Sequence, residues 1–359
     1  MLWQIVLPER ILHTDDDAFW EARLRMNDDN RRTETDLPAL QFGVTHDAVM
    51  VFDLSDRTQI ELTGADRAKF LHGFCTNDIK RLTAGQGCEA FLTNIKGKVV
   101  GHILVFATAT SLWLDTVVGQ GEAIVSHLDR YLIREDVQFV SHCERGELFV
   151  TGSHAAQLLM LDEGLPPYGH VARESFGQPF DIRRVDLFSS PGFLISLPRV
   201  TLETMRSSLL AVGCVAGSSD LFESLRIAAG FPLYGIDITD ENLAQEVART
   251  PQCISFTKGC YLGQEPIARL DAMGHTNREL RRIRFASGVQ PTPGLRLLAA
   301  ETDDEAGVLT SLAPLPTEVG ETLALGYLKT KFGKPDMPIR AMCGADASIG
   351  VVLQPASPN

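Results

Sequence analysis

The chain has 359 residues, of which 44% are hydrophobic and 22% are charged, and it carries a formal net charge of -13 at pH 7. This length is enough for two or three domains with a sizeable core, and the composition is typical of a globular protein. The net negative charge opposes electrostatic binding of nucleic acid over a broad surface, so we expect no direct nucleic-acid partner.

The N-terminal segment and the cysteines bear on where the protein works. Residues 1–40 hold nine acidic and five basic side chains and no apolar stretch long enough for a signal peptide or a membrane span. We therefore expect a polar N-terminal extension, a cytoplasmic protein and no membrane association. The cysteines lie far apart, so the sequence predicts no disulfide framework and no metal site. They are Cys75, Cys88, Cys143, Cys214, Cys253, Cys260 and Cys343.

A duplication begins near residue 60, because residues 60–66 and 148–154 share one pattern, a strand, a Thr-Gly turn and the start of a helix. After the first copy, apolar runs at 99–106 and 111–117 predict two strands. A helical pattern over 121–132 and a short apolar segment at 137–140 follow them. The first copy therefore predicts the order β-α-β-β-α-β.

The second copy repeats that order. Strands are expected at about 181–188 and 192–197, a helix from Thr201, and a short strand near Val215. Two ferredoxin-like units of this kind pack their helices on one face of each antiparallel sheet. The predicted class is therefore α+β, with duplicated halves whose free sheet faces and loops can build a shared cleft.

The pattern changes in the last third of the chain. Residues 220–229 predict a helix, with Asp220 and Glu223 spaced as a capping box and Gly230 as its stop. From Leu280 onward, short apolar runs alternate with Gly and Pro, which is typical of a small β-barrel or sandwich. With a boundary near Gly274, the expected domains are 1–40, 41–273 and 274–359.

The most informative motif is residues 258–265, Lys-Gly-Cys-Tyr-Leu-Gly-Gln-Glu, which sets a thiol between a cation and two glycines. A short helix follows, which Pro266 can open at its first position and Gly274 can close. The charge of Lys258 and the amides of a helix terminus both favour the thiolate of Cys260. The alternative is that Cys260 is a small buried hydrophobe and that the glycines only serve tight turns.

These elements resemble the glycine-cleavage T-protein (aminomethyltransferase) superfamily and, within it, the YgfZ-type folate-binding proteins linked to iron-sulfur cluster assembly. The resemblance covers residues 41 to 353, and its most specific part is 258–265. Supporting segments are 51–55, 70–71 with 76–78, 92–94 with 97–100, and 225–226 with 229–230. The resemblance implies a T-protein-like body around a channel that binds tetrahydrofolate or a one-carbon derivative, with a β-barrel at the C-terminus.

Two departures from the aminomethyltransferase pattern separate the branches of the superfamily. Where those enzymes carry acidic residues for the amine chemistry, this chain has Gly101 and His102. Where they carry a glutamate that binds the pterin, residues 189–193 contain none. His102 is either a replacement base, since imidazole titrates near pH 6.5, or a histidine on one face of a half-buried strand.

Several residues are assigned to the folate site by the resemblance. They are Asn77, Asp78, Asn94, Arg226, Tyr261, Gln264 and Glu265. Arg226 would supply a fixed cation for the folate, and its alternative is a surface ion pair with Glu223. Asn77 and Asp78 match a loop that lines the channel, although Asn-Asp is also an ordinary turn pair. Tyr261, Gln264 and Glu265 are expected to shape the loop more than to perform chemistry.

The resemblance implies a folate-binding accessory protein that supports assembly or repair of iron-sulfur enzymes, including radical enzymes that modify tRNA. Cys260 would engage a partner, a transient cluster or a folate-borne one-carbon unit, and Lys258 would keep the thiol ionised. The expected partners are iron-sulfur client enzymes or assembly factors. One alternative is a folate-dependent aminomethyltransferase or demethylase that acts on a methylated amine, and another is an interaction module that binds no ligand.

Overall fold

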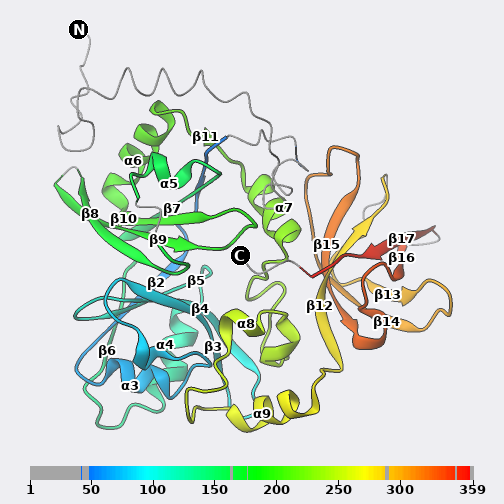
Figure 1. Cartoon of the computed structure of the whole chain (residues 1–359), viewed down its shortest axis with the longest axis horizontal. Coiled ribbons are helices and arrows are strands. Elements are labelled where there is room, and N and C mark those ends of the chain that lie inside the picture. The colour runs from blue at the N-terminus through cyan, green and yellow to red at the C-terminus, as the bar shows by residue number, and fades with distance from the viewer. Residues whose placement is uncertain are drawn as a thin grey trace.

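The computed structural model describes Phe42 and residues 48–161, 165–175, 177–287, 291–343 and 346–355. Figure 1 shows two mixed layers of sheet and helix, one above the other, with a β-barrel to their right. The first copy of the duplication forms the lower layer, and the second copy, with β1 added, forms the upper one. The predicted α+β class, with duplicated halves and a C-terminal barrel, is confirmed.

The lower layer is a five-stranded sheet in the order β3-β4-β5-β2-β6. Its strands are β2 (Thr58–Thr63), β3 (Gln86–Thr93), β4 (Val99–Ala107), β5 (Leu112–Thr116) and β6 (Gln138–Ser141). The helices α3 (Arg67–His72) and α4 (Gly121–Asp129) pack on one face of the sheet, around core residues such as Ile60, Leu71 and Ile124. The predicted β-α-β-β-α-β order holds, and β3 adds an edge strand that pairs with β4.

The upper layer is a six-stranded sheet in the order β11-β1-β7-β10-β9-β8. Its strands are β1 (Met50–Asp53), β7 (Arg145–Thr151), β8 (His170–Ser175), β9 (Gln178–Val185), β10 (Gly192–Pro198) and β11 (Val215–Ala216). The helices are α5 (Ala155–Leu158) and α6 (Arg199–Ala211). This half differs from the first because β1 lies between β7 and β11, antiparallel to β7 and parallel to β11.

The two sheets turn their helix-free faces toward each other, and the alternation of side chains along each strand shows this. On β4, Ile103 and Val105 join the core under the helices, whereas Leu104 and Phe106 pack with Phe149 of the other sheet. Successive side chains of a strand point to opposite faces. Polar residues in register with Leu104 therefore lie between the sheets, and this layer contains the candidate site.

Further helical segments precede β3, lie between the sheets and the barrel in the chain, or follow β15. They comprise the short 3-10 helices η2 (Ile79–Arg81), η3 (Ala244–Val247) and η4 (Thr330–Phe332), and the helices α7 (Ser219–Ala229), α8 (Thr250–Cys253) and α9 (Gln264–Met273). Ser218 caps α7 by accepting a hydrogen bond from Leu221, so the predicted cap at Asp220 lies two residues late. Likewise, α9 begins at Gln264 and not at Pro266, while Gly274 ends it with φ 73° as expected.

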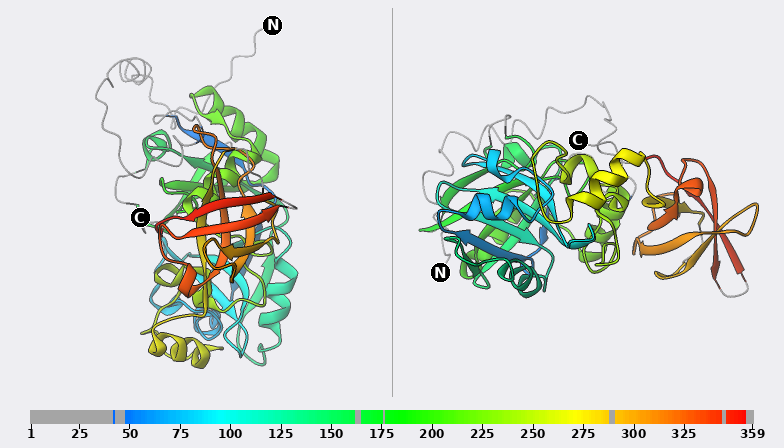
Figure 2. Two further views of the ribbon diagram at one scale, coloured as in Figure 1. Left: turned by 90° about the vertical axis from the view of Figure 1, so that its right-hand side faces the viewer. Right: turned by 90° about the horizontal axis from the view of Figure 1, so that it is seen from below.

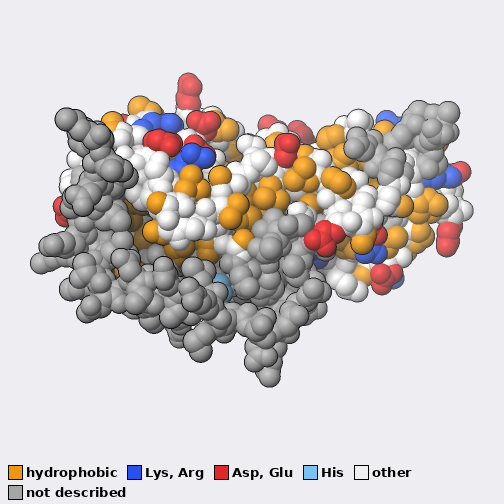
Figure 3. Space-filling model, turned by 90° about the horizontal axis from the view of Figure 1, so that it is seen from above, with side chains coloured by type: hydrophobic (Ala, Val, Ile, Leu, Met, Phe, Trp, Pro, Cys, Tyr) orange, Lys and Arg blue, Asp and Glu red, His pale blue; other side chains and the backbone are white. Residues whose placement is uncertain are grey.

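The last strands close a six-stranded barrel in the order β12-β15-β14-β13-β16-β17. They are β12 (Arg278–Phe285), β13 (Arg296–Ala299), β14 (Glu305–Leu312), β15 (Thr322–Lys329), β16 (Pro338–Cys343) and β17 (Asp346–Val352). Figure 2 shows the barrel projecting from one end of the molecule. Viewed from above, hydrophobic side chains lie across the middle of the surface between the sheets and the barrel (Figure 3). In the described part of the chain, no helix is long and apolar enough to span a membrane.

Candidate functional site

Glu89 is the centre of a buried polar cluster between the sheets. Its side chain is fully buried on β3, and its carboxylate accepts hydrogen bonds from Tyr168 Oη at 2.5 Å and from two nitrogens of Arg249. His102 Nε2 on the neighbouring strand β4 lies 2.7 Å from Glu89 Oε1. Burial alone would raise the pKa of Glu89, but the charge of Arg249 and the contact with His102 hold that pKa well below its usual range. Glu89 is therefore an ionised carboxylate inside the protein.

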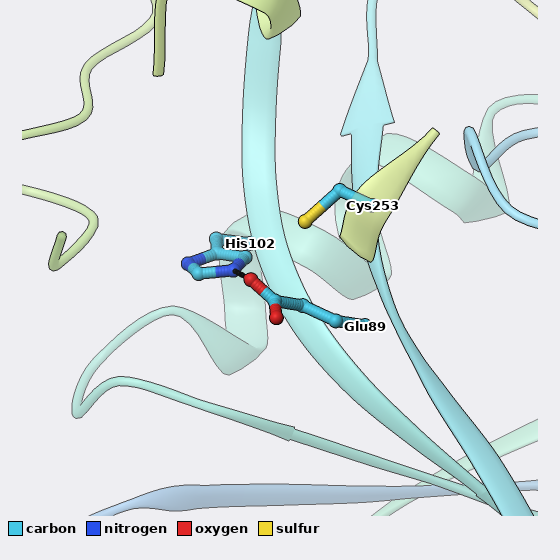
Figure 4. A group of neighbouring side chains, drawn as sticks. All are labelled: Glu89, His102 and Cys253. Carbon is cyan, nitrogen blue, oxygen red and sulfur yellow. Dashed lines mark hydrogen bonds and ion pairs between the residues drawn. The ribbon is translucent and has the colours of Figure 1, made fainter. Parts of the chain in front are cut away.

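Three neighbours hold the imidazole of His102. Phe91 lies tilted against it with ring centroids 5.1 Å apart, and Phe231 stacks on it at 5.6 Å. Glu89 contacts Nε2. Figure 4 shows the second ring nitrogen, Nδ1, on the side that points away from Glu89 and Cys253.

A small pocket opens at this point, and His102 forms part of its wall. Its lining is mostly apolar, with two polar groups. The residues are Arg57, His102, Leu104, Val117, Phe231 and Leu233. Sites for drug-sized ligands usually measure about 300–1,000 Å³, whereas this pocket has room for about one water molecule, so a ring system would enter it only if the surrounding side chains moved.

A second charged network lies beside the pocket and fixes Arg57. Arg57 Nε donates to Asp115 at 2.7 Å and lies 3.5 Å from Glu147 Oε2. Arg183, which is 1% exposed, donates to Glu147 at 3.2 Å and covers the ring of Phe106 at 5.0 Å. Burial and the neighbouring Asp115 raise the pKa of Glu147 well above its usual range. Glu147 therefore holds a proton more readily than a free carboxyl group, in a network of two carboxyl groups and two arginines.

Glu89, His102 and Cys253 bring three possible metal-ligand atoms within 4.8 Å of one another (Figure 4). The surrounding charges oppose a cation there. Arg249 already occupies both oxygens of Glu89. Burial and the charge of Glu89 raise the pKa of Cys253 well above its usual value, whereas metal binding needs a thiolate. The cluster therefore holds His102 in position and is poorly suited to bind a metal ion.

The loop with Cys260 lies at the surface, on the open edge of β3. Thr93 Oγ1 donates to the carbonyl of Leu262 at 2.6 Å, which ties the loop to the strand. Gly263 has φ 80°, and a Cβ there would lie 2.3 Å from the carbonyl oxygen of Asn94, so this position requires glycine. Cys260 itself is exposed. The alternative of a small buried hydrophobe is therefore wrong for this cysteine.

Lys258 points inward, which corrects its expected role. Its side chain is 9% exposed, and Nζ donates to the carbonyls of His72 and Cys75, each at 2.6 Å. The thiol within reach of Nζ is that of Cys75, at 4.0 Å. Nζ also lies 4.8 Å from the ring centre of Tyr261. Through these two hydrogen bonds, Lys258 anchors the loop to the end of α3.

Arg226 also differs from its expected position. It is 1% exposed, and its guanidinium contacts Glu223 at 2.6 Å, Asp237 at 2.9 Å and Ser311 of the barrel at 3.2 Å. One of its nitrogens also donates to the carbonyl of Phe231 at 3.2 Å. The alternative pair with Glu223 exists, but inside the protein and within a larger network. Arg226 joins α7 to the barrel and does not line the pocket.

Asn77, Asp78 and Asn94 stabilise turns. Asn77 Nδ2 donates to the carbonyls of Glu89 at 2.8 Å and Gln252 at 2.9 Å, so it ties β3 to α8. Asp78 pairs with His72 at 3.3 Å and with Arg81 at 3.1 Å. Asn94 Oδ1 accepts from the backbone of residues 96 and 98, which closes the turn between β3 and β4. These side chains support the cluster from outside the pocket.

The remaining predicted residues lie along the loop and the start of α9. Tyr261 is buried in a hydrophobic cluster that includes Phe91, the residue that packs on His102. Gln264 is half-buried, and Glu265 is exposed in the first turn of the helix. Tyr261 therefore shapes the loop, as expected, and links it through Phe91 to the wall of the pocket.

Glu89 and Arg249 belong to the candidate site, but neither was predicted from the sequence. In the register of β3 and β4, Phe91 pairs with His102 and Glu89 pairs with Leu104. Glu89 therefore lies on the same face of the sheet as His102, in the neighbouring pair on that face. A glutamate directly before the apolar residues 90–92 was the available signal. Arg249 lies 160 residues from Glu89 in the chain, in a loop, and no local pattern connects the two.

The family description "GCVT N-terminal domain" matches residues 31–249, which is more than half of the chain. The chain belongs to this family. Within the superfamily it is of the YgfZ type, and it is 28% identical to the tRNA-modifying protein YgfZ of Escherichia coli over 75% of this chain and 82% of that protein. The motif at 258–265 agrees with that placement.

Other relatives span the superfamily. A chloroplastic protein of Arabidopsis thaliana is 28% identical over 78% of this chain, which spans only 65% of that protein's length. The aminomethyltransferase of a Nostoc species is 24% identical over 89% of both chains. The solved aminomethyltransferase T of Bartonella henselae covers 90% of this chain with a TM-score of 0.73 and 20% identity, and it shares the fold.

Proposed function

We propose that this chain is a folate-binding accessory protein that supports the assembly or repair of iron-sulfur enzymes, including enzymes that modify tRNA. Its partners would be those client enzymes or their assembly factors. Support for the folate comes from the family and from the pocket between the sheets. Support for the accessory role comes from the YgfZ relatives and from the exposed Cys260.

The pocket is the observation that carries the proposal. Phe231, Leu104 and Val117 give it apolar walls that suit a flat heterocycle, and His102 and Arg57 supply polar contacts in fixed positions. Small-molecule sites typically combine apolar walls with a few such polar groups. In this structure the pocket has room for about one water molecule, so a pterin ring would have to widen it, and the glutamate tail of a folate would extend outside.

Cys260 would engage the client. Its loop is fixed by Lys258 on one side and by Thr93 on the other, so the exposed thiol sits on a defined backbone. Stable iron-sulfur clusters normally take four protein ligands. A cluster at Cys260 would therefore be shared with a partner and held briefly.

Complementation tests this role in cells that lack the native protein and depend on an iron-sulfur enzyme that modifies tRNA. The Cys260→Ser variant should fold normally but restore little of the tRNA modification. Cys143→Ser is the matched control, because Cys143 is also exposed and lies far from the motif in sequence. Full complementation by Cys260→Ser would remove the thiol from the proposed function.

A further inference from the structure

The loop that carries Cys260 lies along the end of α3 and the residues after it. Its backbone donates hydrogen bonds to the carbonyls of Gly73 and Thr76, each at 2.9 Å. Between these two anchors the side chain of Phe256 is 47% exposed, and Cys260 is exposed as well. An aromatic ring on a fixed backbone contributes contact area at a low cost in conformational entropy when a partner packs on it.

Exposed basic side chains surround this loop on the side of α3. Residues 67–88 hold four basic side chains and one acidic side chain, whereas the whole chain holds 33 basic and 46 acidic ones. Lys69 on α3 is exposed, and so are Lys80 and Arg81 on η2, which contacts α3. The acidic residue is Asp78, which pairs with Arg81 at 3.1 Å and is itself only 16% exposed. This part of the surface is therefore positive on a chain with a net negative charge.

Lys80 lies close to the base of the loop, as two buried groups show. Burial lowers the pKa of Lys258, and the charge of Lys80 lowers it further. The ring of His72 contacts the carbonyl of Lys258 at 3.0 Å, and its pKa is lowered by burial, by Lys258 and by Lys80. Among the described residues, no ion pair neutralises Lys69 or Lys80. Their charges are available to a partner.

We propose that Lys69, Lys80, Arg81 and Phe256 form a docking surface for an acidic segment of the client protein, a proposal that rests on the accessory function above. Charge complementarity favours this partner, because opposite charges speed the encounter of two proteins and fix their orientation. Phe256 would pack on an apolar side chain of the same segment. Docking here brings a cysteine of the client to Cys260 despite the net charge of -13, which otherwise repels an acidic partner.

The test compares two short peptides that differ only in charge. Each carries one cysteine, flanked by glutamates or by lysines, whose sulfur is joined to nitrothiobenzoate in a disulfide. The Cys260 thiolate attacks the peptide sulfur, a disulfide forms between peptide and protein, and the coloured nitrothiobenzoate leaves as a thiolate. At about 0.01 M ionic strength, where charges act over about 30 Å, the acidic peptide should react at Cys260 at least about tenfold faster. At about 1 M salt the two rates should converge.

Cys143 is the reference within the same molecule. It is also exposed, and its neighbour in the chain is Glu144. Mass spectrometry of the digested protein assigns each peptide adduct to its cysteine. The acidic peptide should have no advantage at Cys143, because that thiol lies outside the basic surface on a chain that is negative as a whole.

A triple variant removes the charges of the basic surface, and a second triple variant controls for net charge. The first consists of Lys69→Gln, Lys80→Gln and Arg81→Gln. The control neutralises exposed lysines of the barrel and consists of Lys329→Gln, Lys331→Gln and Lys334→Gln. Substitutions of exposed side chains usually change stability by less than about 0.5 kcal/mol, so both variants should fold. Only the first should lose the advantage of the acidic peptide at Cys260.

Equal rates of the two peptides at Cys260 in wild type would overturn the proposal, and so would an equal loss in both triple variants. If added tRNA protects Cys260 while the acidic peptide has no advantage, the surface binds RNA and the proposal is wrong. The wild-type salt series decides the matter even if a variant fails to fold. These outcomes leave open the cellular role of the Cys260 thiol, which complementation by Cys260→Ser tests separately.

Discussion

Replacing Arg226 by methionine should destabilise the protein and leave the pocket beside His102 intact. Methionine keeps much of the apolar stem but removes the guanidinium, which contacts Glu223, Asp237, Ser311 and the carbonyl of Phe231. Asp237 is 1% exposed, so the variant would leave a buried carboxylate without its cation. Breaking a buried pair from one side costs about 3–5 kcal/mol. That is a large part of the roughly 5–15 kcal/mol by which domains are stable.

Urea unfolding, monitored by circular dichroism, measures this loss. The partner variant Asp237→Asn keeps an oxygen for Thr310 and Ser311, which donate to Asp237 at 2.6 and 2.7 Å. If the pair is the source of the loss, the double variant should lose less than the sum of the two single variants, by about 1–3 kcal/mol. The reasoning would be refuted if Arg226→Met stayed within about 0.5 kcal/mol of wild type and instead bound tetrahydrofolate more weakly.

Three further outcomes follow from the same contacts. Lys258→Met should lower the free energy of unfolding by about 2 kcal/mol or more, because two buried carbonyls lose a charged donor, and urea unfolding with no change would contradict the anchoring role. Glu147 has a raised pKa in the folded state, so the stability tied to its protonation is fully present below its ordinary value of 4.5 and is lost as pH rises through the folded pKa. The free energy of unfolding of Glu147→Gln, relative to wild type, should therefore rise by up to about 1.4 kcal/mol per pH unit above that value. If urea unfolding shows the same change of free energy with pH for both proteins between about pH 5 and 8, the raised pKa of Glu147 is contradicted. Glycine-cleavage assays should show no methylene transfer, because Gly101 and His102 provide no carboxylate beside the reacting amine, and robust transfer would favour the aminomethyltransferase alternative.

Much of the fold could be predicted from the sequence because it depends on local patterns. The repeated Thr-Gly turns at 60–66 and 148–154, with apolar runs after each, predicted both ferredoxin-like halves. The insertion of β1 between β7 and β11 could not be predicted, because strand pairing depends on contacts that are distant in the chain. The cap of α7 was misplaced since Ser218 competes with Asp220, and only the backbone geometry decides between them.

The candidate site was harder to predict because a charged residue that is buried pairs with groups inside the protein and is not free to bind a ligand. The sequence predicted Lys258 as a cation beside the thiol and Arg226 as either a folate-binding cation or a surface partner of Glu223, and the structure gives both of them internal partners. The opposite holds for His102, whose role depends on Glu89 and on Arg249, 160 residues further along the chain from Glu89. The motif left open whether Cys260 is a reactive thiol or a small buried hydrophobe, and the structure places it at the surface, in a loop with positive-φ glycines such as Gly259, at φ 95°.

Calorimetric titration with tetrahydrofolate tests the central claim most directly, with a variant that fills the pocket. Leu233 lines the pocket and is half-buried, so Leu233→Trp should occupy the space without unfolding the protein. Wild type and Cys260→Ser should bind tetrahydrofolate alike, at a single site, and Leu233→Trp should bind at least about tenfold more weakly. Equal binding by a folded Leu233→Trp, or no binding by wild type, would contradict the proposal that this pocket holds a folate.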